Sequence, residues 1–344
     1  MDSTSSVAPL GGPFVDLKYR WPAKYLASWV ALVAVVALAG LFQPATFSRF
    51  SVELITALAG CLAVATLGQN LVVMVGSVDL SVPALMTLAA ALNVHFVGQL
   101  GAAESLVVTV LVCAAISAAS GALIAFLRLN ALIVTFSVNA IVASALTVWL
   151  GMQFSPTGKT AGWLRSVATG SWLSVSTVFW FAVVLAAVTA FVLSRTRGGR
   201  RVAAVGDNRA AARMLGARVG LITTAAFAVA GVFYALAGLF VAGLVDSPNP
   251  GLGSPYQLTT ITVVAIAGTS FAGGGSSIGA LMAAALMLQT LNQLLALQNL
   301  GAGTLNVVQG ALLVAAVSLN TWAQMGRSGF RRLRTTFGSF RTPA

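Results

Sequence analysis

Charged side chains are scarce in this 344-residue chain. Asp, Glu, Lys and Arg together make up 8% of it, whereas they make up about a quarter of an average soluble domain. Only seven residues are acidic, and the chain contains one histidine and two cysteines. So small a share of charge excludes an ordinary soluble globular domain.

The shortage of reactive side chains also excludes most enzyme chemistry. Cys61 and Cys113 both lie inside apolar runs, where a buried cysteine behaves as a small hydrophobic residue. His95 is the one histidine and has no partners with metal-ligand spacing, so we interpret it as a structural residue near the membrane interface. Since no paired carboxylates and no Ser/His/Asp or Cys/His set can be assembled, we expect neither a catalytic site nor a metal site.

Apolar residues dominate what is present, at 58% of the chain. Runs of about 20 apolar residues, enough to cross a bilayer as a helix, recur from residue 26 to residue 322. The sequence therefore predicts an all-α, polytopic membrane protein with one membrane domain. The ten expected helices lie near residues 26–43, 52–75, 80–97, 104–126, 129–150, 175–194, 221–244, 256–272, 277–297 and 304–322.

Basic residues are distributed unevenly between these expected helices. With both termini in the cytoplasm, sixteen of the 19 basic residues are cytoplasmic, and only Arg49, Lys159 and Arg165 are outside. Lys and Arg accumulate in cytoplasmic loops, so this orientation is favoured, and it explains the net charge of +12 without a nucleic-acid partner. The predicted organisation is a cytoplasmic tail over residues 1–25, a membrane domain over 26–322, and a basic cytoplasmic tail over 323–344.

The largest interior loop, residues 195–220, carries seven arginines. Burying each at the centre of a membrane helix would cost about 2.5 to 3.5 kcal/mol, so we expect the loop in the cytoplasm. Its stretch GDNRAAARMLG predicts a two-turn helix near residues 207–216, which Asp207 or Asn208 can cap and Gly216 can end. From its residues alone, the loop either docks on a partner or only sets the topology.

The stretch GSVDLSVP places a carboxylate between two apolar runs. An ionised Asp79 is costly there unless it is capped or wet. Alone or with Ser81 it can cap the helix that follows, or it can line a translocation pathway. Both roles stay open, and they can coexist.

The stretch FAGGGSSIG joins two apolar runs that are too close for an ordinary loop. Gly273, Gly274 and Gly275 allow a tight turn, and Gly275 with Gly279 forms a small-xxx-small pair suited to close helix packing. The segment therefore predicts a helix hairpin. It is not a phosphate cradle, because it has no preceding strand and no Lys-Ser/Thr ending. The near P-loop QFSPTGKT, residues 153–160, lacks the first glycine and is interpreted as a loop between spans.

Side-chain amides recur in the last two expected helices. Gln289, Asn292 and Gln293 fall three and four residues apart and share one helix face, as do Asn306 and Gln309. Amides in a membrane need polar partners, so these faces either hold helices together or line a wet pathway. The same two interpretations apply to three asparagines in earlier helices, Asn70, Asn93 and Asn139.

Three of these stretches, in the same order, resemble motifs of the ribose-type (monosaccharide) ABC importer permeases. GSVDLS, residues 76–81, resembles the family's Gly-Gly-Ile-Asp-Leu-Ser signature. AVGDNRAAARMLG, residues 204–216, resembles its cytoplasmic coupling loop, and AGTSFAGGGSSIG, residues 267–279, resembles its glycine- and serine-rich run. The resemblance covers about residues 50 to 320, and the chain departs from the family pattern at Ser77, Ala267, Arg209 and Ala210.

This resemblance implies a type II ABC importer-like permease subunit in a bacterial inner membrane, surrounded by lipid. Such a subunit pairs with a second permease subunit, identical or different, and receives a monosaccharide or similar small polar solute from a periplasmic binding protein. A separate ABC ATPase holds ATP and magnesium, so this chain is expected to hold no cofactor. The coupling helix, which would lodge in the ATPase and move with it as a rigid body, would comprise Gly206, Asp207, Asn208, Ala211, Ala212, Arg213 and Gly216.

Two other classes of function stay open from the residues: an ion-gradient-driven secondary transporter of a small polar solute, and a membrane-embedded enzyme or channel. A proton-coupled carrier usually places carboxylates or histidines deep in the membrane. Here Glu53 and Asp79 both lie toward the ends of expected helices, which favours the ABC permease.

Overall fold

The computed structural model describes residues 23–153, 160–245, 249–298, 301 and 303–318. The predicted tail over 323–344, nearly all of the tail over 1–25, Lys159 and most of the near P-loop lie outside these residues. The described chain is almost entirely helical. Its elements are α2 (Ala23–Phe42), η1 (Pro44–Phe47), α3 (Arg49–Met74), α4 (Val82–Leu100), α5 (Ala102–Phe126), α6 (Ala131–Gln153), α7 (Gly162–Thr169), β1 (Ser171–Trp172), β2 (Val175–Ser176), α8 (Thr177–Arg195), α9 (Arg197–Asp207), α10 (Arg209–Met214), α11 (Val219–Leu244), α12 (Tyr256–Ile266), α13 (Ile278–Leu297) and a last helix, Gly303–Ser318.

Eight of the described helices are long and apolar enough to cross a membrane, namely α2, α3, α4, α5, α6, α8, α11 and α13. Each corresponds to a helix expected from the sequence. The other two expected spans are shorter: α12 has 11 residues, and the last helix is described only to Ser318. The count of ten spans and the cytoplasmic position of both termini stay predictions.

The helix expected over residues 256–272 is wrong in its last six residues. α12 ends at Ile266, and Gly268 takes a left-handed φ of +77° while its N–H donates to the Ala265 carbonyl. At about 1.5 Å per residue, 11 residues reach only about halfway across a hydrocarbon core of about 30 Å. Residues 267–277 therefore continue as non-helical backbone up to the start of α13.

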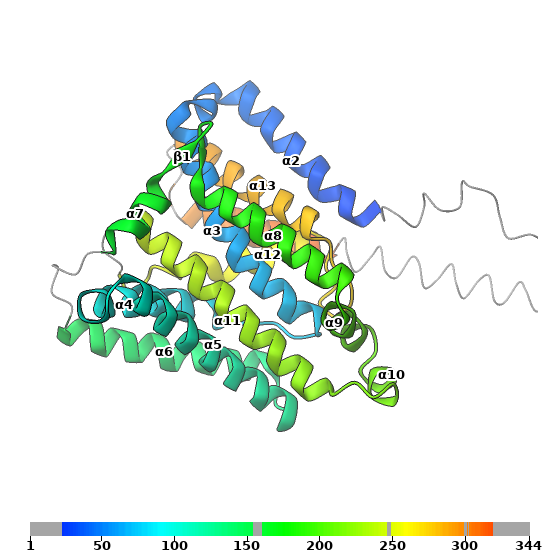
Figure 1. Ribbon diagram of the computed structural model, residues 1–344. Coiled ribbons are helices and arrows are strands. Elements are labelled where there is room, and N and C mark those ends of the chain that lie inside the picture. Colours follow the sequence, from blue (N-terminus) through cyan, green and yellow to red (C-terminus); the bar gives the residue numbers. More distant parts are fainter. Residues whose placement is uncertain (1–22, 154–159, 246–248, 299–300, 302, 319–344) are drawn as a thin grey trace, which may run out of the picture.

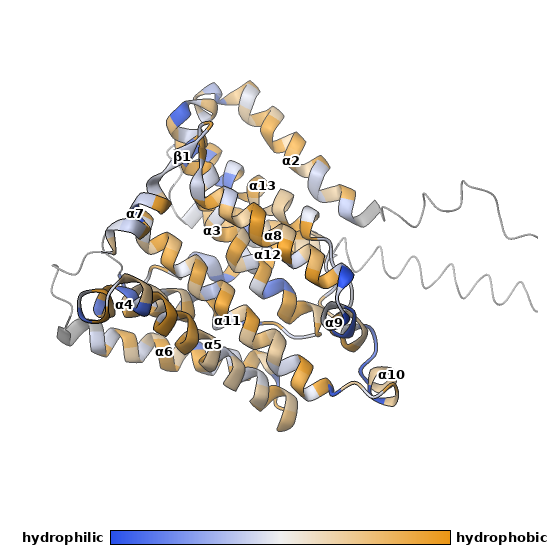
Figure 2. Ribbon diagram, viewed as in Figure 1, coloured by the Kyte–Doolittle hydropathy of each residue, from blue (hydrophilic) through white to orange (hydrophobic). Residues whose placement is uncertain are grey.

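Two long helices, α3 and α11, form the centre of the bundle. In each, 72% of the most apolar 18-residue window is buried, compared with 11% in α2 and 22% in α6 and α8. The helices around them carry large hydrophobic side chains on their outer faces, and Figure 2 shows these long helices as largely hydrophobic. Such faces suit lipid.

Glycines let the central helices approach closely. A Cβ added to Gly68 of α3 would lie 2.8 Å from the Tyr234 ring of α11, and one added to Gly231 of α11 would lie 2.6 Å from the Cys113 carbonyl oxygen of α5. A Cβ added to Gly238 would overlap the Met86 backbone of α4. Small residues at helix crossings drive packing in membranes, where lipid removes the hydrophobic driving force.

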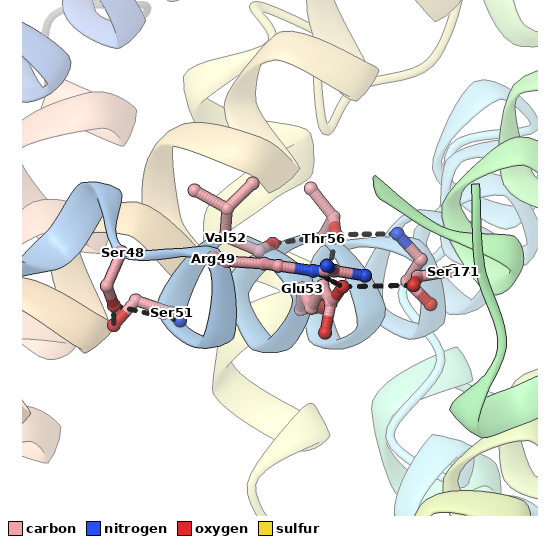
Figure 3. A network of polar contacts seen from close by, with 8 residues as sticks. Ser48, Arg49, Ser51, Val52, Glu53, Thr56 and Ser171 are labelled. Carbon is pink, nitrogen blue, oxygen red and sulfur yellow. Dashed lines mark hydrogen bonds and ion pairs between the residues drawn. The ribbon is translucent and has the colours of Figure 1, made fainter. Parts of the chain in front are cut away.

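The two ends of the bundle differ. α9 and α10 project from one end, and α7 with the β1–β2 ribbon covers the other (Figure 1). At the ribbon end the Ser171 hydroxyl donates to Glu53 Oε1 at 3.0 Å, and Arg49 Nε donates to the same oxygen at 3.0 Å (Figure 3). The Ser176 N–H donates to Thr56 Oγ1 at 2.9 Å. These bonds attach the ribbon to the first two turns of α3.

Replacing Gly238 by leucine is expected to destabilise the fold by about 1–3 kcal/mol, the usual cost of overpacking. The matched control is Gly98→Ala in α4, where an added Cβ meets nothing within 4 Å. Thermal unfolding of the detergent-solubilised variants should show a lower Tm for Gly238→Leu alone. Equal Tm values would contradict the close α4–α11 contact.

Candidate functional site

Three segments that are far apart in the sequence meet at the end of the bundle that carries α9 and α10. They are Met74–Gly76, Gly206–Arg209 and Thr269–Ser276, which we call the three-motif junction. The Gly274 N–H donates to the Met74 carbonyl at 3.0 Å. A Cβ on Gly206 would overlap both the Met74 carbonyl oxygen and Gly274 N. Of the motif at residues 76–81 only Gly76 lies here, where an added Cβ would be 3.2 Å from the Ala272 carbonyl oxygen and 3.8 Å from the Arg209 guanidinium. Parts of the three motifs singled out in the sequence therefore pack together.

Asn70 of α3 holds the glycine-rich loop to the bundle. Its side chain is fully buried, and its Nδ2 donates to Ser276 Oγ at 2.9 Å. Its Oδ1 accepts a bond from Thr269 Oγ1 at 3.0 Å. The nitrogen and the oxygen of the Asn70 amide thus both bond to side chains within residues 267–277. Of the two interpretations of Asn70, contact between segments fits this geometry.

Left-handed backbone occurs at only some of the glycines in this loop. Gly273 and Gly274 have φ values of +104° and +106°, which side chains other than glycine rarely adopt. Within the described part of this chain Gly275 and Gly279 make no close packing contact: both residues are exposed, and an added Cβ meets nothing near Gly275 and only the Trp29 ring, at 3.8 Å, near Gly279. The close approach falls at Gly274, where the loop turns against α3.

The basic loop folds as two helices where one was expected. Asn208 has an extended backbone, and its Oδ1 accepts bonds from the Ala210 and Ala211 N–H groups, both at 3.0 Å. The helix predicted near 207–216 is therefore α10, which begins at Arg209, is capped by Asn208 and not Asp207, and ends at Met214. Gly216 follows with a φ of +79°, as its position predicted.

α9 was missed by the sequence analysis. It begins after Thr196, whose hydroxyl accepts a bond from the Gly199 N–H at 3.2 Å, and it ends at Asp207. Its hydrophilic face is evident in Figure 2. On the opposite face Val205 packs with Ala212 of α10 and with Val75, the residue that follows α3. The sequence signal for this helix was Thr196, a residue type that can cap a helix, followed three residues later by a small residue. The signal was missed because the arginines of this stretch hid the spacing of its apolar residues.

Arg209 links α10 to the end of α3. Its guanidinium donates to the Val75 carbonyl at 2.6 Å. The carbonyls at a helix C-terminus lack partners within the helix and carry partial negative charge. A cation there is stabilising, which gives a structural role to a residue that the sequence analysis noted only as a departure from the family pattern.

Met214 and Leu215 form an exposed apolar pair at the end of α10. These residues are 83% and 87% exposed, the two highest values among the large hydrophobic residues that the structure describes. Ala212 behind them is buried, whereas Arg213 beside them is exposed. The sequence analysis did not single out this pair, although two long apolar side chains within a basic loop were a signal for it.

Asp79 lies in the packed interior and shapes the turn before α4. It is 1% exposed, and its Oδ1 accepts bonds from the Ser81 N–H at 2.8 Å and the Ser81 hydroxyl at 2.6 Å. Ser81 is the residue before α4, but its side chain does not cap that helix. With its amide turned toward Asp79, Gln69 accepts from the Asp79 N–H at 3.2 Å and donates to the Asp79 carbonyl at 3.1 Å.

The first turn of α4 is completed from α6. The Ala84 N–H donates to Asn139 Oδ1 at 3.2 Å, and the Leu80 N–H donates to Thr135 Oγ1 at 3.0 Å. Asn139 thus joins two helices, which is one of the two roles considered for it. Asn93 does the same between α4 and α5, where its Nδ2 donates to Ser105 Oγ at 3.2 Å.

A cavity of about 600 Å³ lies toward the opposite end of the bundle, and we call it the amide cavity. It is lined by residues from the first half of α3, the end of α11, the start of α12, the second half of α13 and the start of the last helix. Since successive long helices run in opposite directions, these portions all lie on the side of the ribbon. The lining residues are Ile55, Leu58, Val241, Leu252, Ser254, Pro255, Tyr256, Thr259, Gln289, Asn292, Gln293, Ala296, Leu305, Asn306 and Gln309.

Of the four residues proposed for a pathway or a helix cap, Asn292 lines this cavity, whereas Asn70, Asp79 and Ser81 do not. Asn292 Nδ2 donates to Gln289 Oε1 at 3.2 Å, and Gln309 Nε2 donates to Asn292 Oδ1 at 3.2 Å. The two helix faces that the sequence predicted to carry amides, one on α13 and one on the last helix, therefore contact each other in the wall of the cavity.

Residues 51–317 match the family model described as "Branched-chain amino acid transport system / permease component". The chain is 27% identical over 293 residues to the ribose import permease protein RbsC of Haemophilus influenzae, covering 84% of this chain and 91% of the relative. It is 28% identical over 303 residues to RbsC of Escherichia coli K12, covering 86% and 94%. It is 29% identical over 301 residues to the autoinducer 2 import system permease protein LsrC of Photorhabdus luminescens, covering 83% and 87%. No solved structure matches the chain.

Removing either polar partner of the Asn70–Thr269 bond is expected to cost about 1–3 kcal/mol, since the other is left buried without it. We expect Asn70→Leu and Thr269→Val each to destabilise the protein, and the double variant to lose less than the sum of the two. Denaturant unfolding of the four proteins measures this coupling. Strict additivity would contradict a direct bond between helix and loop.

Proposed function

The chain belongs to the family described as "Branched-chain amino acid transport system / permease component", and from that membership we propose that it is the membrane-spanning subunit of an ATP-binding cassette importer. It is a permease and a multi-pass protein of the bacterial inner membrane. In this proposal a periplasmic binding protein delivers a monosaccharide or a similar small polar solute. An ABC ATPase supplies the energy, and a second permease subunit, identical or different, completes the pathway.

The exposed pair Met214 and Leu215 is the observation that carries this proposal. Both residues lie at the end of a short helix and are more than four-fifths exposed. Exposing apolar side chains to water costs free energy, and exposed apolar patches mark interaction sites. Arg213 and Arg218 flank the pair, so a matching surface would be an apolar hollow with an acidic rim. A coupling helix that lodges in an ATPase needs a tip of this kind.

The three-motif junction supplies the connection between that tip and the membrane helices. α10 packs on α9, and Gly206 at the end of α9 lies against Met74 and Gly274 with no room for a side chain. Tightly packed interfaces transmit movement as rigid bodies. A displacement of α10 by the ATPase would therefore reach α3 and the loop before α13, and both α3 and α13 contribute residues to the amide cavity.

A proton-coupled carrier usually places a titratable group on its pathway. The described residues that line the amide cavity include no Asp, Glu, Lys, Arg or His. This observation favours the ATP-driven importer over a proton-coupled form of the ion-driven alternative.

Serine substitutions at Met214 and Leu215 are expected to weaken ATPase binding by about tenfold each, as removal of an interface anchor does. Co-purification of the ATPase with the permease, followed by titration in detergent, measures this effect. The matched control is Leu173→Ser, which removes a leucine 74% exposed at the opposite end of the bundle. Unchanged ATPase binding by both tip variants would contradict the proposed coupling role.

The proposed orientation places α10 in the cytoplasm and the ribbon outside. Leu215→Cys should react with a membrane-impermeant maleimide only after cells are permeabilised, whereas Leu173→Cys should react in intact cells. The native Cys61 and Cys113 are buried, so their background labelling should be low. Labelling of Leu215→Cys in intact cells would reverse the topology and overturn the importer scheme.

A further inference from the structure

A small pocket of about 290 Å³ lies between α9 and the end of α10, and we call it the arginine pocket. The lining residues are Arg197, Arg200, Arg201 and Ala204 of α9, together with Ala212, Leu215, Gly216 and Ala217. The other residues from α9 are three, four and seven positions after Arg197, so all four lie on one face of that helix. One wall of the pocket therefore carries three guanidinium groups, and the other wall is small and apolar.

No acidic side chain of the described residues balances this charge. The acids that the structure describes, none of which lines the pocket, are Glu53, Asp79, Glu104 and Asp207. Asp207 is the nearest of them in the sequence, and its carboxylate lies against Gly274 of the glycine-rich loop. Arg200 uses one donor on the Arg195 carbonyl, at 3.2 Å, whereas a guanidinium group has five N–H donors. The pocket therefore suits an anion with several acceptor oxygens.

The pocket lies at the depth where a membrane span ends. α8 has 19 residues, which at about 1.5 Å per residue matches a hydrocarbon core of about 30 Å. Thr196 alone separates α8 from α9, and a Cβ added to Gly199 would overlap the Leu193 backbone. The first turn of α9 is thus packed on the last turn of α8, which places the arginines of the pocket at the level of the lipid headgroups.

α8 also presents an apolar face that suits acyl chains. Val184, Val188 and Phe191 are four and three residues apart, lie on one side of the helix, and are 60%, 54% and 63% exposed. The same face ends at Arg195, whose carbonyl accepts the bond from Arg200. A phospholipid with its chains along this face would therefore have its headgroup beside the arginine pocket.

Guanidinium groups and phosphates match in geometry as well as in charge, because the planar N–H fork pairs with two phosphate oxygens. Anionic phospholipids present such phosphates at the cytoplasmic surface of a membrane, where basic pockets beside membrane helices bind them. A soluble ATPase is a poorer match, since its proposed contact is the tip of α10, which Figure 1 shows farther from the bundle than α9. The position of the pocket thus favours a lipid phosphate.

We propose that the arginine pocket binds the phosphate of an anionic phospholipid of the inner membrane. The acyl chains lie along α8, and Arg197, Arg200 and Arg201 hold the headgroup. A lipid bound in this way contacts both α8 and α9, so it holds α9 at the membrane surface. The site goes beyond the proposed function, because it requires neither the solute nor the binding protein nor the ATPase.

The test is the binding of a fluorescent phosphatidylglycerol to the purified full-length chain in neutral detergent micelles. The pocket variants are Arg197→Gln and Arg201→Gln, and Leu215 is left unchanged because it also belongs to the proposed ATPase contact. The matched control is Arg128→Gln, which removes an exposed arginine from another loop on the same predicted side of the membrane. All three arginines are exposed, so we expect equal Tm values, and thermal unfolding checks that each variant is folded.

We expect saturable binding that each pocket variant weakens about fivefold, the contribution of one basic residue beside an anionic lipid. Arg128→Gln should bind like the unmodified protein, and unlabelled phosphatidylcholine should not compete. Unchanged binding by both pocket variants would overturn the inference. An equal loss in Arg128→Gln would overturn it as well, because the lipid would then respond to surface charge in general.

Two further measurements separate the lipid from other anions. Displacement of the labelled lipid by millimolar inorganic phosphate would identify a site for free phosphate and overturn the lipid assignment. Titration of the ATPase against Arg197→Gln and Arg201→Gln is expected to give the affinity of the unmodified protein. Weaker ATPase binding together with unchanged lipid binding would assign the arginines to the ATPase interface and overturn the inference, while the permease function would stand.

Discussion

Backbone polar groups must find partners inside a membrane, and this constraint governs the part of the molecule that matters for transport. Two non-helical segments, residues 75–81 and 267–277, interrupt an otherwise helical bundle. Irregular backbone that is buried needs hydrogen-bond partners from the surrounding protein. For the segment after α3, Thr135 accepts a bond from the Leu80 N–H and Arg209 donates to the Val75 carbonyl. In the glycine-rich loop the Gly274 N–H donates to the Met74 carbonyl, and Asn70 holds the loop through the side chains of Thr269 and Ser276.

These contacts also join the two non-helical segments to three helices of the protein. The residues that supply partners to the interrupted segments belong to α3, α6 and α10, so none of these elements can shift without breaking bonds to the segments between them. The glycines at 206, 273 and 274 remove the side chains that would otherwise hold α9 and the loop apart. In the proposed function, movement at α10 would reach α3 and the glycine-rich loop through packed backbone and not through a flexible tether.

Much of this arrangement could be predicted from residue patterns. Long apolar runs specify spans because lipid offers the backbone no partners, and all eight long helices were found this way. Asn208 predicted the start of α10 and Gly216 predicted its end, because capping and left-handed conformations are local properties of the chain. The shared face of Gln289, Asn292 and Gln293 followed from helical spacing alone, although two roles remained open for it.

What the sequence by itself determined is local: which segments are helical and apolar, where short helices begin and end, and that charge gathers in one loop. Only the tertiary structure decided that α12 stops at Ile266, that Gly274 and not Gly275 makes the close approach, and that Asp79 faces Gln69 and Ser81 while Asn292 faces a cavity. The physical reason is that the partner of a buried polar group lies far away in the chain. Asn70 and Thr269 are separated by 199 residues, and no local pattern carries information about a bond across that distance.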